Sequence, residues 1–165
     1  MTDGVAEIDA LIAAEKTIVG VAKWKPNRES TVRLKATLAV NGAVRPGLIL
    51  DANANTHTFD QHGAICLIYQ EIVIERLNFH PHDPHTNRLG TGRLSGLVLP
   101  MGKHRYYPWS ENQFLGWPRY TKVNLAMAES IALELPTYAE ALAYFLDRTN
   151  IKGDLIPPPY DPLLL

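Results

Sequence analysis

The stretch Thr31-Val32-Arg33-Leu34-Lys35-Ala36-Thr37-Leu38-Ala39-Val40 alternates apolar and polar side chains over most of its length. A period of two residues is typical of a β-strand that is buried on one face and solvated on the other. The pair Asn41-Gly42 then predicts a tight turn, and a further strand is expected over residues 46–51. This part of the chain therefore predicts antiparallel strands joined by short turns.

More strands are expected on both sides of this pair. Residues 17–24 are rich in β-branched side chains and predict an earlier strand, with residues 25–28 as the turn that follows it. Downstream, apolar runs over residues 65–69 and 72–77 predict two neighbouring strands, and a short strand is expected over residues 94–99.

Helices are expected at the two ends of the domain. Residues 5–16 place apolar side chains at helical spacing behind a polar start. Residues 137–140 have the spacing of a capping box, and an apolar helical face follows, formed by Ala141, Leu142, Phe145 and Leu146. The order of elements predicts an α+β fold, an antiparallel sheet with an N-terminal and a C-terminal helix packed on it.

Length and composition favour one domain. The chain has 165 residues, of which 46% are hydrophobic, enough for a sizeable core. We expect a single globular domain over residues 1–152. Gly153 and the prolines at 157–159 predict an extended proline-rich tail over residues 153–165, lying on its own domain, although Pro-Pro-Pro-Tyr also matches a ligand of WW domains.

The sequence also bears on location. Its apolar runs are shorter than the ~18 to 20 residues that a membrane helix needs, and its start lacks the features of a secretory signal. A cytoplasmic protein without a membrane partner is expected. The one cysteine, Cys66, lies in an apolar run and is expected to pack in the core.

Polar and aromatic residues concentrate in residues 75–88 and 103–109. Four of the six histidines of the chain lie in these two segments, from His80 to His104. No hydrophobic period explains these segments, and prolines favour extended backbone in them. From residue 75 to 122 there are seven Lys or Arg against three Asp or Glu. A candidate site is therefore expected here, in surroundings that favour an anionic ligand.

The leading hypothesis is a binding module for an anionic small molecule, RNA or a protein partner. Arg76 and Arg105 would bind the anion, while His85 and Asn87 would direct hydrogen bonds. Tyr106, Tyr107 and Trp109 would form a wall on which bases stack. Further aromatic and cationic side chains follow in the same region, namely Trp117, Arg119, Tyr120 and Lys122.

Three alternatives remain open. Paired histidines, His85 and His104, would suit a metal-independent phosphodiesterase or RNase. His80, His82 and His85, with His104 as a further candidate, would suit zinc or another divalent metal in a small hydrolase, although no cofactor is otherwise predicted. In the third alternative, the His-Pro segment is a contact in a homo-oligomer.

The order of these motifs suggests a family. Ile72-Val73-Ile74-Glu75-Arg76-Leu77-Asn78, then Pro84-His85-Thr86-Asn87, a His-aromatic stretch and a final Phe-Leu helix resemble a family of small bacterial proteins, a domain of unknown function. Its motifs run Arg-Leu-Asp, His-x-Asn-Pro-x-Gly and His-x-His-aromatic. The resemblance implies that Arg76, His85, Asn87 and His104 occupy polar motif positions. Here Asn78 stands at the family's carboxylate, Arg88-Leu89-Gly90 replaces Pro-x-Gly, and Tyr106 replaces the second histidine.

Overall fold

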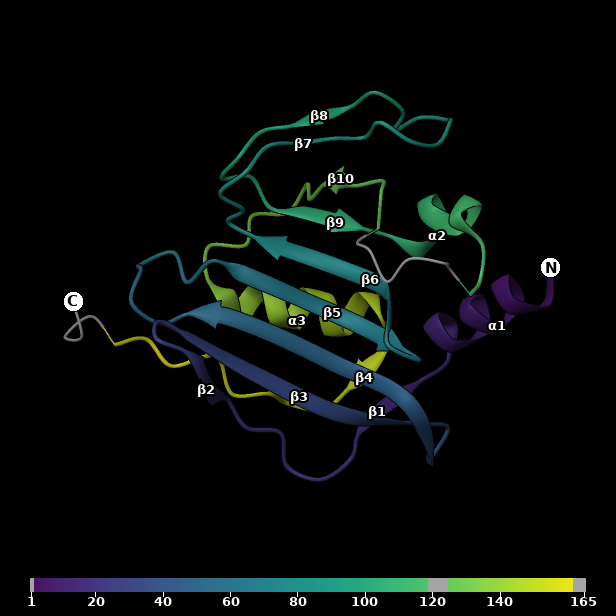
Figure 1. Cartoon of the computed structure of the whole chain (residues 1–165). Coiled ribbons are helices and arrows are strands. Elements are labelled where there is room, and N and C mark those ends of the chain that lie inside the picture. Colours follow the sequence, from purple (N-terminus) through teal and green to yellow (C-terminus); the bar gives the residue numbers. More distant parts are fainter. Residues whose placement is uncertain (1, 119–124, 162–165) are drawn as a thin grey trace.

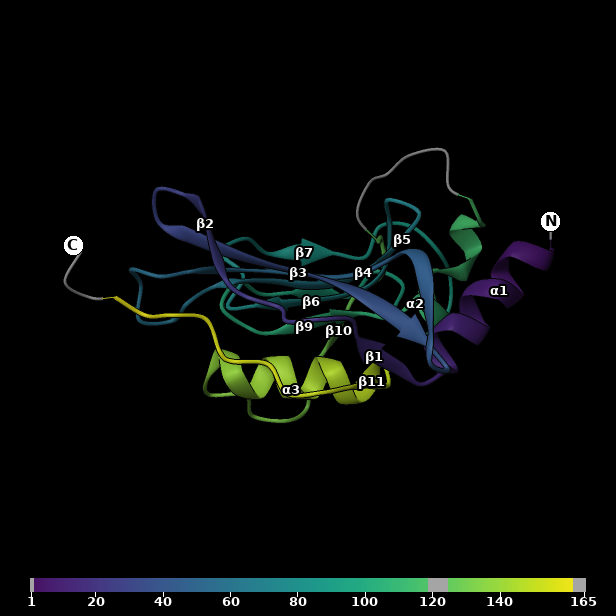
Figure 2. The same cartoon turned by 90° about the horizontal axis from the view of Figure 1, so that it is seen from below.

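The computed structural model describes residues 2–118 and 125–161. It confirms the α+β class: a mostly antiparallel sheet is combined with α1 (Thr2–Ala13) near the start of the chain and α3 (Tyr138–Arg148) near its end (Figure 1). Helix α3 lies along one face of the sheet, and α1 lies beyond one end of the strands (Figure 2). Within the described ranges, no helix crosses the opposite face, which we call the open face.

The main sheet has nine strands in the described residues. Eight follow the order β10-β9-β6-β5-β4-β3-β1-β11, and β2 pairs with β3. Only β1 and β11 pair in parallel among the strands described. The strands are β1 (Lys16–Ile18), β2 (Lys25–Arg28), β3 (Thr31–Val40), β4 (Ala43–Asn55), β5 (Gly63–Tyr69), β6 (Ile72–Phe79), β9 (Arg105–Tyr107), β10 (Glu129–Ser130) and β11 (Ile151–Lys152).

The core lies between the sheet and α3. Alternate residues of β3 to β6 point toward the helix, and Leu34, Leu50, Leu67 and Leu77 are at most 1% exposed where Phe145 packs against the sheet. Full burial of each such side chain stabilises the fold by about 1.5–3 kcal/mol. The two-residue period seen in the sequence is thus the physical basis of the core.

The start of α3 and the end of α1 are satisfied by nearby side chains. The predicted capping box is present: the Thr137 side chain accepts from the Glu140 backbone, and the Glu140 side chain accepts from the Thr137 backbone. At the end of α1, the buried Lys16 Nζ donates to the carbonyl oxygens of Leu11, Ile12 and Ala14 at 2.6–2.9 Å. These bonds satisfy helix carbonyls that lack intrahelical partners.

Some predicted boundaries are wrong. Residues 25–28 form β2 rather than a turn; Pro26 is tolerated because β2 pairs on one side only and its register shifts there. In place of the strand predicted over residues 17–24, the shorter β1 forms, which ends at Ile18. Strand β4 extends well beyond the predicted residues 46–51. In place of a strand over 94–99, only β8 (Val98–Leu99) forms, paired with β7 (His85–Thr86) in a separate ribbon.

Short elements frame the open face. Helix α2 (Trp109–Asn112) and a 3-10 turn (Gln113–Leu115) follow β9, and a second apolar cluster of Leu99, Tyr107, Leu125 and Ala128 lies beneath the β7–β8 ribbon. The tail, as far as residue 161, lies on the domain: the Trp24 indole donates to the Ile156 carbonyl, and the Asp161 N–H donates to the Thr56 carbonyl. Among the described helices, none is long and apolar enough to cross a bilayer.

Candidate functional site

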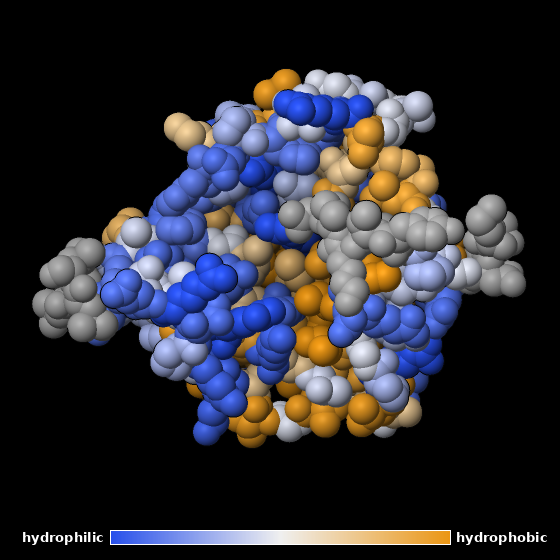
Figure 3. Space-filling view, viewed as in Figure 1, coloured by the Kyte–Doolittle hydropathy of each residue, from blue (hydrophilic) through white to orange (hydrophobic). Residues whose placement is uncertain are grey.

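Two rows of side chains cross the open face, because cross-strand partners in an antiparallel sheet point to the same side. The first row contains Arg33, Asn53, Ala64, Asn78 and Arg105, and the second contains Lys35, Asp51, Cys66, Arg76 and Tyr107. These rows carry four cations and one carboxylate. Figure 3 shows a broad hydrophilic area over the centre and left of this face, beside a hydrophobic area just right of the centre.

The two ends of the rows differ in electrostatics. On β3, the Arg33 guanidinium makes a two-point ion pair with the buried Asp51 carboxylate, at 2.8 and 2.5 Å. On β6, the Arg76 Nε instead donates to the neutral Asn78 Oδ1 at 2.6 Å, and its guanidinium lies 5.9 Å from the centre of the Tyr107 ring. The charge of Arg33 is therefore largely neutralised by Asp51, whereas the Asn78 amide brings no opposing charge to Arg76.

Arg105, on β9, is only 4% exposed. Its Nη2 donates to the Asp83 carbonyl oxygen at 2.7 Å. Its buried Nε and Nη1 find no acceptor in the described part of the chain. Buried donors of a charged group without a partner are rare and costly, and an ion or a water is the usual explanation.

Arg76 and Arg105 line the same hollow, a cavity of about 350 Å³ at the ends of β5 and β6. Asn78 pairs with Arg105 across the strands and lies two residues from Arg76 on β6. It lines the hollow too, as do His62, His82 and the exposed Asp83. The structure thus brings the two arginines of the binding hypothesis together, with amide and imidazole groups around them. Such a set of donors suits an anion.

The three aromatic residues do not form an exposed wall. Tyr106, Tyr107 and Trp109 are 0%, 5% and 1% exposed. The two tyrosines lie on β9, an inner strand between β6 and β10, and Trp109 begins α2, where its ring contacts Trp117. Tyr106 packs against Phe145 of α3, and the Trp109 indole donates to Asp9. Stacking of bases on these rings is therefore not supported. Arg119, Tyr120 and Lys122 lie outside the described residues.

Asn87 and His85 hold loops in place. The buried Asn87 amide donates to the Leu94 and Ala128 carbonyls and accepts from the Ala128 N–H, at 2.7–2.9 Å. The Nε2 of His85 lies 2.9 Å from the Ala126 carbonyl oxygen, and its ring contacts Tyr107. Neither residue lines the hollow of Arg76 and Arg105.

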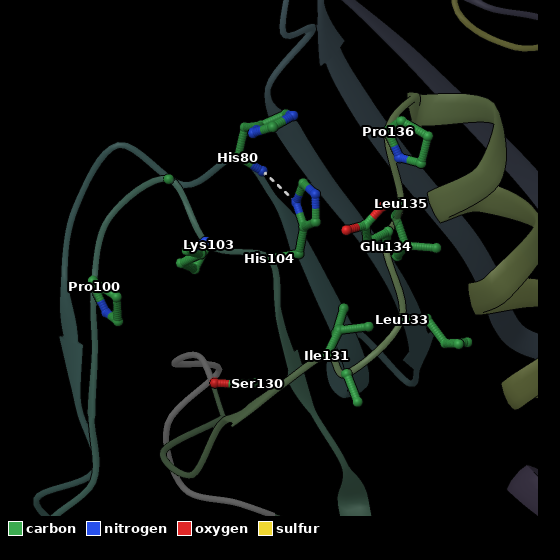
Figure 4. Close-up of a pocket in the computed structure, with 12 residues that line it drawn as sticks. His80, Pro100, Lys103, His104, Ser130, Ile131, Leu133, Glu134, Leu135 and Pro136 are labelled. Carbon is green, nitrogen blue, oxygen red and sulfur yellow. Dashed lines mark hydrogen bonds between the residues drawn. The ribbon is translucent and has the colours of Figure 1, made fainter.

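His104 lies on the other side of the sheet, in a second hollow of about 660 Å³ between the turn at 100–104 and residues 130–136 (Figure 4). Its Nδ1 accepts from the His80 N–H at 3.1 Å, and its other nitrogen bonds the Leu135 backbone. Burial, then the charges of His80 and Lys103, lower the pKa of His104. Its ring nitrogens are thus both engaged.

His85 and His104 are not brought together. The His104 ring stacks on Phe79, on the α3 face of the sheet, at 4.5 Å between centroids. The His85 ring contacts Tyr107, which belongs to the apolar cluster on the open face. The sheet separates the two imidazoles, so this geometry does not support the proton-transfer pair of the RNase alternative.

The ligand group for a metal differs from the predicted one. In the described residues, Asp60, His62 and His82 form the group whose ligand atoms all lie within 4.8 Å of one another, and it includes neither His80 nor His85. Asp60 and His62 were missed because residues 53–63 have no regular period. The short pattern Asp-x-His was the signal in the sequence.

Cys66, in the middle of the open face, is not a reactive thiol. Burial raises the pKa of the Cys66 thiol to about 11, in spite of the nearby positive charge of Arg76. A thiol with such a pKa stays protonated at neutral pH and is a poor nucleophile.

Comparison of the chain with protein-family models, curated proteins and solved structures found no significant match.

Proposed function

We propose that this protein binds an anionic, phosphate-bearing ligand in the hollow of Arg76 and Arg105. One observation carries the proposal: the buried Arg105, which lines this hollow, has two donor nitrogens, Nε and Nη1, without an acceptor in the described residues. A phosphate oxygen accepts from such donors with charge-assisted hydrogen bonds, which are about twice as strong as neutral ones. Arg76 and Asn78 supply further polar groups on the same wall.

Binding is favoured over proton-transfer chemistry by the positions of the histidines. His104 has both ring nitrogens engaged, and His85 lies outside the hollow. The hollow therefore contains groups that hold an anion, and His85 and His104, the pair expected for a metal-independent nuclease, do not meet in it.

A second candidate, an RNA strand, is favoured by a specific observation at the other end of the rows. Lys23, Lys25, Arg33 and Lys35 line a further hollow of about 370 Å³ there. Strands β3 and β9 are four positions apart in the sheet, which corresponds to roughly 19 Å at the usual strand spacing. A stripe of this length would meet several successive phosphates.

The test is calorimetric titration with inorganic phosphate in low-salt buffer containing chelator. We expect Arg105→Gln to weaken phosphate binding about tenfold or more, because a charge-assisted hydrogen bond contributes about 1.5–3 kcal/mol. Asn78→Asp, of nearly the same shape, should also weaken binding, because its carboxylate would neutralise Arg76. Arg88→Gln, at an exposed position that does not line the hollow, is the matched control.

Equal affinities in all four proteins, or no binding to the wild type, would overturn the proposal. Oligonucleotides of two to eight residues then separate the two candidates. If RNA follows the whole stripe, affinity rises with length, and its salt dependence steepens by about 0.7 in log–log slope for each phosphate neutralised. If the ligand is a small phosphate compound, affinity levels off at the shortest length.

A further inference from the structure

A second group of side chains lies at the rim of the same hollow and has a different chemistry. Asp60 and His62 belong to the connection between β4 and β5, and His82 follows β6. These segments meet where the strands end, so that residues 20 apart in sequence face one another. From this arrangement we infer that Asp60, His62 and His82 form a binding site for a divalent transition metal, with zinc as the best fit.

The distances support a shared metal better than direct hydrogen bonds. The Asp60 Oδ1 lies 3.3 Å from His62 Nδ1, and the Asp60 Oδ2 lies 3.4 Å from His82 Nε2. Charge-assisted hydrogen bonds are usually shorter, about 2.7–2.9 Å. Two ligand atoms bound at 2.0–2.1 Å to a tetrahedral zinc ion are about 3.3 Å apart, which is close to the separation of each imidazole nitrogen from its nearer Asp60 oxygen.

The donor set also matches. Two imidazoles and one carboxylate are a common three-ligand set for zinc and for other first-row metals, and they leave one position open. The imidazole rings lie with their centroids 3.8 Å apart, so that both ligating edges reach the same carboxylate. Because His62 and His82 also line the hollow of Arg76 and Arg105, the fourth ligand would come from the hollow or from solvent.

The loop around Asp60 holds the ligands in place. The Thr58 hydroxyl donates to Asp60 Oδ1 at 2.7 Å, and the Asn55 side chain accepts from the backbone N–H groups of His57 and Thr58 at 2.8 Å. Groups that orient the ligands in this way typically change metal affinity 10- to 100-fold when they are lost. The ligands themselves are partly exposed, which leaves the site accessible from solvent.

The experiment is a titration of the chelator-treated protein with zinc in phosphate-free buffer, followed by cobalt(II) as a spectroscopic substitute. We expect one zinc per chain, and visible cobalt absorption typical of a low-coordinate site with nitrogen and oxygen ligands. His62→Ala and His82→Ala should each lower zinc affinity by about 100-fold or more. His57→Gln, in the same connection, and His85→Gln, on β7, are the matched controls and should bind as the wild type does.

The inference is overturned if the wild type takes up no zinc, if His62→Ala and His82→Ala bind it normally, or if His57→Gln loses it equally. Near-ultraviolet circular dichroism confirms that each variant is folded, which the partial exposure of these side chains favours. The site does not depend on the proposed anion binding. Phosphate titrations contain chelator and zinc titrations contain no phosphate, so failure of either proposal leaves the other standing.

Discussion

Replacing Arg105 with methionine separates the effect of this residue on the free energy of unfolding from its role in binding phosphate. Methionine can occupy the path of the arginine stem while it removes the charge and all of the N–H donors. In the absence of an anion, the wild type keeps two buried donor nitrogens without an acceptor in the described chain, and it gains one bond to the Asp83 carbonyl.

The magnitudes favour the variant. Each unsatisfied buried donor costs about 1–3 kcal/mol, and the bond to Asp83 contributes about 1.5–3 kcal/mol. The Arg105→Met protein should therefore be more stable by about 2 kcal/mol in anion-free buffer. For a chain of this length, that raises Tm by roughly 4–8 °C. Phosphate at 100 times Kd should add about 2.7 kcal/mol to the wild type and little to the variant.

Urea denaturation with and without phosphate measures both quantities, and Arg33→Met is the matched control on the same face. Because Arg33 pairs with the buried Asp51 carboxylate, its loss should destabilise the protein by roughly 1–3 kcal/mol and leave the phosphate effect largely intact. The reasoning is refuted if Arg105→Met loses stability as Arg33→Met does, or if it keeps the full stabilisation by phosphate.

Three further predictions concern the framework of the site. Burial and nearby charges lower the pKa of His104, so the unfolded chain takes up a proton at a higher pH than the native state, and the free energy of unfolding declines as the pH falls below 6.5. His104→Gln should flatten this pH dependence in urea titrations. An NMR pKa of His104 at or above the ordinary value would contradict the prediction. Burial raises the pKa of Glu75 above 4.5, in spite of the hydrogen bond from the Trp109 N–H, so that the native state holds the extra proton and stability falls as the pH rises from about 4.5. The free energy of unfolding of Glu75→Gln, relative to that of the wild type, should therefore be higher at pH 7 than at pH 4.5. The opposite order would show that the native state stabilises the carboxylate. A β-carbon at Gly63 would overlap the Asn53 carbonyl oxygen. Gly63→Ala should therefore lower the free energy of unfolding by several kcal/mol, as severe packing changes do. An unchanged Tm would show that β4 and β5 move apart easily.

The sequence predicts the centre of the sheet well and its edges poorly. Alternation in β3 follows directly from burial against α3, and the capping box at Thr137 is a purely local device. The strand β2 depends instead on pairing with β3, which overrides the turn signal of residues 25–28. The residues between β7 and β8 are shaped by the Asn87 amide, whose partners at Leu94 and Ala128 no short pattern predicts.

The candidate site shows the same limit. Arg76 and Arg105 line one hollow because of the register of β6 against β9. In the sequence, these two strands are separated by the β7–β8 ribbon. Tyr106, Tyr107 and Trp109 have the composition of a stacking surface, yet the inner position of β9 buries the two tyrosines and packing at the start of α2 buries Trp109. Asp60 and His62 gain a possible ligand role only when the β4–β5 connection meets His82, and this contact leaves no periodic trace in the sequence.

Two arginines on the open face differ in the partner beside them, and this difference bears on the anion hypothesis. Arg33 and Arg76 both project from inner strands onto this face, but Arg33 faces a carboxylate and Arg76 faces an amide. A guanidinium with a buried carboxylate partner gains little from an external anion, because that anion would have to displace an ion pair already in place. The Asn78 amide accepts one N–H bond from Arg76 and adds no negative charge of its own, which favours the approach of an anion to the arginines on β6 and β9. Asn78 pairs with Arg105 across the strands and lies two residues from Arg76 on β6, so a neutral side chain stands beside both arginines where Arg33 has a carboxylate.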